Sequence, residues 1–80
     1  MTKAYIRPIS PRNLRINIIE QLATKKLGSE ISKDIASKFV EHGYSASDLK
    51  HLLAHLKGER QVDAIARVSV KRALRLMEAA

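Results

Sequence analysis

Residues 43–58 read GYSASDLKHLLAHLKG, and this stretch decides the fold class. Ser45 and Asp48 have the spacing of a capping box, in which each side chain accepts a hydrogen bond from the other residue's backbone N–H. Leucines at positions 49, 52, 53 and 56 then form one face of a helix. Glycines at both ends of the stretch are typical of helix ends. The stretch therefore predicts a short amphipathic helix between two turns, which Gly58 closes.

The same signals predict three further helices, over residues 10–27, 29–43 and 60–77. A serine hydroxyl at position 10, followed by proline, suits the start of the first helix, and Gly28 suits its C-cap. Apolar residues recur every three or four positions in each segment. We therefore expect an all-α fold, a small bundle of about four helices.

Residues 1–9 are expected to form an extended basic arm, and residues 10–80 a single helical domain. Two local alternatives stay open. Leu14 to Ile18 alternates apolar and polar residues, which is a strand pattern, and two chains could pair there as a ribbon. Val68 to Val70 is β-branched at both ends, which predicts a weak point in the last helix.

The charge points to a polyanionic partner. The chain of 80 residues has a net charge of +7. Residues 1–28 contain six Lys or Arg and one acid, residues 29–49 contain two and four, and residues 50–80 contain seven and three. Such a charge is an argument about partners, not about fold. We expect DNA ahead of RNA, because one Phe, two Tyr and no Trp offer little for base stacking.

The sequence lacks the residues that several functional classes require. There is no cysteine, no Gly-rich phosphate loop and no context for a serine nucleophile, so we expect neither an enzyme nor a cofactor. His51 and His55 are spaced to share a helix face, but no third ligand follows in order, so no metal site is predicted. No apolar run approaches the roughly 20 residues of a membrane span, and no secretory signal is visible, so we expect a cytoplasmic protein.

Helices 29–43 and 45–58, joined by a turn with glycine, match the outline of a helix-turn-helix. In that motif the second helix presents its first residues to base edges. Phe39 stands where the motif has a small residue, and the first helix is acidic, so an ordinary helical hairpin is the alternative. The side chains that would contact DNA are Ser45, Ser47, Lys50 and His51.

A basic row along the last helix is the second candidate. Its members are spaced at four or seven residues, which places them near one line, and few acids are spaced to neutralise them. A polyanion would relieve their mutual repulsion; the alternative is an ordinary solvated face. The row consists of Arg60, Arg67, Lys71 and Arg75, with Arg72 beside it.

The arm and the first helical turn form the third candidate. Basic arms reach into minor grooves or along phosphates in several DNA-binding folds. The alternative is a frayed end that happens to be basic. The residues concerned are Lys3, Arg7, Arg12 and Arg15.

Together these patterns predict a DNA-binding protein of the transcriptional or plasmid/phage regulator type, acting through phosphate contacts and limited base readout. The alternative function is a protein-interaction module, an adaptor or inhibitor that docks on an acidic partner. Contact with a membrane surface is disfavoured, because residues 60–77 contain no Trp or Phe. We expect a homodimer, because the core is small and the last helix is apolar around much of its girth.

Overall fold

The computed structural model describes residues 10–79, and within them the all-α prediction is confirmed, because four helices and no strand are present. The strand alternative for Leu14 to Ile18 is wrong, and the two-chain ribbon with it, because this segment lies inside the first helix. The predicted arm, residues 1–9, lies outside the described residues. The helices are α1 (Pro11–Ala23), α2 (Gly28–Glu41), α3 (Ala46–Ala54) and α4 (Gln61–Ala79).

Two helices begin with the predicted caps. At the start of α1 the Ser10 hydroxyl accepts a hydrogen bond of 3.1 Å from the Asn13 backbone N–H. At the start of α3 the Asp48 N–H donates to the Ser45 hydroxyl at 3.0 Å, and the Ser45 N–H donates to the Asp48 carboxylate at 3.3 Å. These bonds satisfy backbone donors that a helix leaves unpaired at its N-terminus.

The turn between α2 and α3 is also of the predicted kind. Gly43 has a φ of 76°, a left-handed conformation that suits glycine. The Tyr44 N–H donates back to the Phe39 carbonyl at 3.1 Å, as in a Schellman motif. The far end of α3 differs from the prediction, because the helix ends at Ala54 and not at Gly58.

The end of α1 was predicted wrongly. The helix was expected to reach about Leu27 with Gly28 as its C-cap, but it ends at Ala23. The Thr24 hydroxyl donates to a carbonyl of the last turn, and such a bond competes with further helical pairing. Lys25 takes the left-handed conformation with a φ of 64°, and Gly28 becomes the first residue of α2.

The expected weak point in α4 does not interrupt the helix. Residues 68–70 are helical, and Ser69 and Val70 are completely buried. The Ser69 hydroxyl donates to the Ile65 carbonyl one turn earlier at 2.7 Å, which satisfies it inside the core. Packing against the other helices therefore outweighs the lower helix propensity of β-branched residues.

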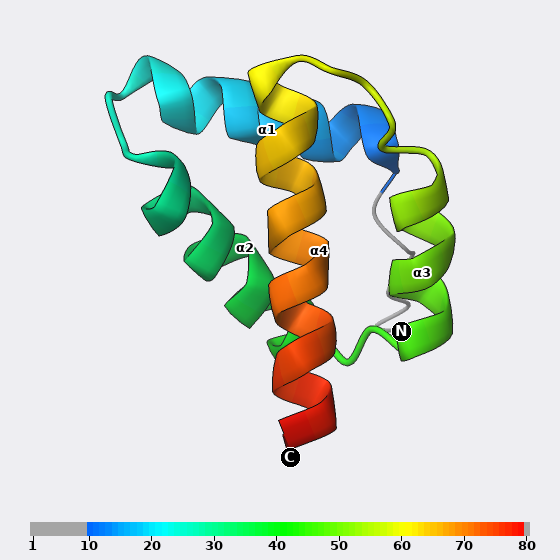
Figure 1. The fold of residues 1–80 in the computed structure, drawn as a ribbon. Helices are drawn as coiled ribbons and strands as arrows, with labels where there is room; N and C mark the ends of the chain where they lie inside the picture. Colours follow the sequence, from blue (N-terminus) through cyan, green and yellow to red (C-terminus); the bar gives the residue numbers. More distant parts are fainter. Residues whose placement is uncertain (1–9, 80) are drawn as a thin grey trace, which may run out of the picture.

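α4 runs through the middle of the molecule (Figure 1), with α2 on one side, α3 on the other and α1 crossing near its N-terminal end. Each of the other helices packs against α4, and α2 does so most extensively. The helix-turn-helix is therefore not confirmed: α2 and α3 lie on opposite sides of α4, whereas that motif packs its two helices against each other. The physical reason is the long apolar surface of α4, which both shorter helices cover.

One buried cluster contains side chains from all four helices. Small buried residues on α2 and α4, among them Ala36, Ala66 and Ala73, allow these two helices to approach closely. Most of the apolar surface of α4 is thus covered within one chain, although Val68 and Leu76 stay about half exposed. The homodimer stays a prediction. The cluster consists of Leu14, Ile18, Ile31, Ile35, Ala36, Phe39, Leu49, Leu52, Leu56, Ile65, Ala66, Val70 and Ala73.

Candidate nucleic-acid interface

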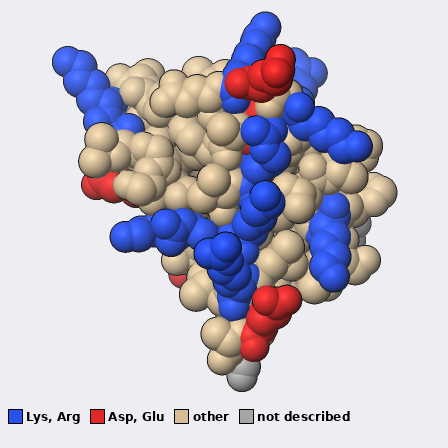
Figure 2. All heavy atoms as spheres, in the orientation of Figure 1, with Lys and Arg blue, Asp and Glu red and all other residues tan. Residues whose placement is uncertain are grey.

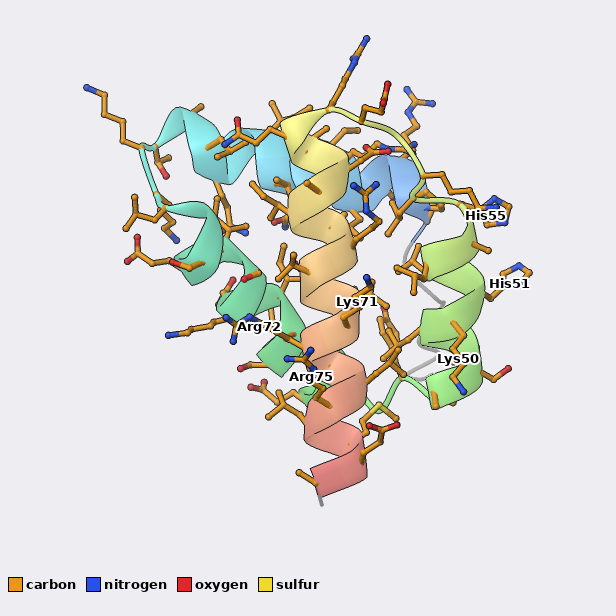
Figure 3. The ribbon with its side chains drawn as sticks, viewed as in Figure 1. Lys50, His51, His55, Lys71, Arg72 and Arg75 are labelled. Carbon is orange, nitrogen blue, oxygen red and sulfur yellow. The ribbon has the colours of Figure 1, made fainter. Side chains whose placement is uncertain are left out.

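One face of the molecule is strongly basic. Figure 2 shows Lys and Arg side chains in a column along α4, with further basic side chains on either side. Acidic side chains lie near the two ends of the column and at the left edge of this face. Figure 3 shows that Lys71, Arg72 and Arg75 of α4 lie on this face, with Lys50 of α3 beside them. We call these four residues the basic face. Within residues 10–79 none of them forms an ion pair.

Lys71 and Arg75 are the exposed centre of the basic face. They are four residues apart in α4, so they stand one turn apart on the same side of the helix. Two like charges in this arrangement repel each other by a few tenths of a kcal/mol in an isolated helix. Since no described acid pairs with either of them, their charges remain available to a partner.

Arg67 belongs to the predicted row but is engaged inside the fold. Its guanidinium Nη1 donates to the Leu56 carbonyl at 2.8 Å and to the Gly58 carbonyl at 2.6 Å. Both carbonyls lie in the loop between α3 and α4, where helical pairing has ended. Arg67 therefore holds this loop against α4, and the row is interrupted between Arg60 and Lys71.

Arg15, predicted from the first helical turn, also has an internal partner. Its Nε and Nη2 donate to the two carboxylate oxygens of Asp63 at 2.8 and 3.1 Å, and Nη2 donates to the His55 carbonyl at 3.0 Å. The Gly58 N–H donates to the same carboxylate at 2.9 Å. The bonds from Arg15 and then Gly58 stabilise the charged form, so the pKa of Asp63 lies below its usual value. Arg15 thus joins α1, the α3–α4 loop and α4.

The remaining arginines of the prediction lie apart from the basic face. Arg60 is exposed just before α4, where its carbonyl accepts the first hydrogen bonds of that helix. Arg12 is exposed in the first turn of α1, the helix that crosses near this end of α4. At 1.5 Å per residue, Arg60 lies about 22 Å along the axis from Arg75. Lys3 and Arg7 lie outside the described residues.

α3 presents its predicted polar side chains to solvent. Lys50, His51 and His55 all point away from the core (Figure 3). The two histidine rings meet edge to face, with centroids 5.4 Å apart. Among the described residues no third metal-binding side chain joins them. Ser47 is exposed, while the Ser45 hydroxyl is occupied by its role as N-cap.

The sequence patterns did not indicate Lys33 and Ser37 as site residues, although both line a groove together with Arg72 and Arg75. They are one turn apart on α2, which sequence reasoning treated as acidic overall. Their spacing was visible, but nothing in it showed that this side of α2 would border the basic side of α4. The groove appears only when the two helices pack.

No helix in the described part of the chain is long and apolar enough to cross a membrane. No family model matches this chain, and no curated protein or solved structure matches it either. Function is therefore inferred from the chain's own residues.

Proposed function

We propose that this chain is a small DNA-binding protein of the regulator type, which holds duplex DNA through phosphate contacts on its basic face. One observation carries the proposal. Arg15 and Arg67 are engaged by the fold, whereas Lys71 and Arg75 stand exposed and unpaired, one turn apart, on the same face as Lys50. DNA phosphates would neutralise these cations and release the counterions that surround the duplex.

The test of this proposal is the salt dependence of binding to a generic duplex. In the double variant Lys71→Ala, Arg75→Ala, log K against log salt should become less steep by about 1.8, since each phosphate contact contributes about 0.9. At about 0.1 M salt this corresponds to roughly 60-fold weaker binding. Arg67 stays unchanged, because its loss would also release the α3–α4 loop.

A matched control separates local contact from the loss of net charge. Lys25→Gly with Lys26→Ala removes the same two charges from the exposed turn between α1 and α2, and glycine suits the positive φ of Lys25. This control should keep most of the wild-type slope. A folded Lys71→Ala, Arg75→Ala variant with an unchanged slope would contradict the role of the basic face. A wild type without salt-dependent binding would overturn the DNA function and favour the acidic protein partner.

Base readout is proposed for the exposed side of α3. The variant Lys50→Ala, His51→Ala should weaken binding to a duplex selected from a random pool about tenfold more than binding to unselected duplex, because base contacts carry discrimination. Competition between the two duplexes measures this ratio. The Lys71→Ala, Arg75→Ala variant is the comparison, since phosphate contacts act on both duplexes alike. Equal losses in the α3 variant would show that α3 reads no bases.

A further inference from the structure

A groove runs between α2 and the C-terminal half of α4, and three cations border it. It is open to solvent, has a volume of about 480 Å³ and is lined by Lys33 and Ser37 from α2 and by Arg72 and Arg75 from α4. Ala36, Leu76 and Ala79 complete the lining, so no acidic side chain of residues 10–79 contributes to it. Two helices that are separate in sequence thus bring three positive charges and one hydroxyl to a single depression.

Arg72 is the side chain whose hydrogen bonding is incomplete. Its guanidinium reaches from α4 towards α2 (Figure 3), and its Nε is buried without a hydrogen-bond partner among the described residues. A buried N–H without an acceptor is unfavourable, and a charged one more so. No described residue forms an ion pair with Lys33, Arg72 or Arg75. An anion in the groove would balance these positive charges, and a rotation of the Arg72 side chain would bring its buried Nε–H to an oxygen of that anion.

We propose that the α2–α4 groove binds one backbone phosphodiester of the bound DNA. The planar fork of arginine suits two oxygens of one phosphate, while lysine adds a compact charge and the Ser37 hydroxyl a further donor. Arg72 and Arg75 belong to both the groove and the basic face, so a strand that follows Lys71 and Arg75 continues into the groove. The inference rests on the proposed function and extends the DNA contact from α4 to α2.

The first measurement is a charge removal on α2 with a control from the same helix. Lys33→Ala should make log K against log salt less steep by about 0.9 and weaken duplex binding about eightfold at roughly 0.1 M salt. Lys38→Ala removes the same charge five residues further along α2, where Lys38 pairs with Asp34 at 3.3 Å and lies outside the groove. It should bind duplex within about twofold of wild type.

The second measurement observes the groove directly. A duplex titration followed by ¹H–¹⁵N spectroscopy should shift the Arg72 Nε–H resonance, because this buried N–H gains a phosphate acceptor. The shift should be reduced in Lys33→Ala and kept in Lys38→Ala.

The outcomes separate the two proposals. If the Lys71 amide shifts on DNA binding while the Arg72 Nε–H does not, and Lys33→Ala binds as wild type, the groove assignment is overturned and the DNA function stands. If neither resonance moves and no salt-dependent binding is found, the DNA function fails and the groove assignment with it. A shift of Arg72 Nε–H with weaker binding of Lys33→Ala supports both.

Discussion

Phe39→Ala is expected to lower the free energy of unfolding by about 3–5 kcal/mol. Phe39 is 3% exposed in the shared core, and its ring packs on Tyr44 with centroids 5.2 Å apart. Removing it leaves a cavity among side chains of several helices as well as losing buried apolar surface. Since a domain of this size has a total stability of about 4–12 kcal/mol, the variant should be close to unfolding. Urea unfolding followed by circular dichroism measures the loss.

This prediction also tests the arrangement of α2 and α3. In a helix-turn-helix this position is occupied by a small residue, so alanine would be tolerated there. Val40→Ala is the control: it shortens the neighbouring side chain, which is 41% exposed, and should cost less than about 1 kcal/mol. Similar small costs for both variants would contradict the packing of Phe39 against the rest of the core.

Asp63→Ala is expected to cost about 2–3 kcal/mol, the scale of losing charge-assisted hydrogen bonds at a buried carboxylate. The Asp63 side chain is 6% exposed and accepts hydrogen bonds from Arg15 and from the Gly58 N–H. Without it, both donors lose their shared acceptor where α1 and the α3–α4 loop meet α4. Thermal or urea unfolding of the variant measures the effect.

The Asp63 carboxylate also makes the free energy of unfolding depend on pH. Because the pKa of Asp63 is lowered in the folded chain, its contribution is present above the unfolded pKa of about 3.9 and is lost as the pH falls through the lower folded pKa. Wild type should therefore lose this part of its stability in strong acid, and Asp63→Asn should not. Asp34→Asn is the control, because its pair with Lys38 is exposed and should contribute less than about 1 kcal/mol. Parallel stability curves for wild type and Asp63→Asn would contradict this role.

Local hydrogen bonding explains which structural predictions were confirmed. The Ser10 cap, the Ser45–Asp48 capping box and the Gly43–Tyr44 turn each join residues within five positions of one another, so the sequence itself contains both partners. The end of α1 was missed because Lys25, an ordinary residue, takes the left-handed conformation before the more obvious Gly28 is reached. Glycine is the preferred residue for that conformation but not a required one.

Some features of the candidate site follow from the sequence alone, and others depend on tertiary packing. The sequence alone determined the charge, the four helices and the exposed cations Lys71 and Arg75, because helical spacing places residues on a face whatever packs behind them. Only the tertiary structure decided which cations are engaged inside the fold. Arg15 and Asp63 are 48 positions apart, and no periodicity links them.

Tertiary packing likewise decided that Lys33 borders the same groove as Arg72, and that α2 and α3 lie on opposite sides of α4. The physical reason is the range of the interactions. Caps and apolar spacing act within a turn or two of helix, whereas the relative positions of helices follow from how all their apolar faces are buried together.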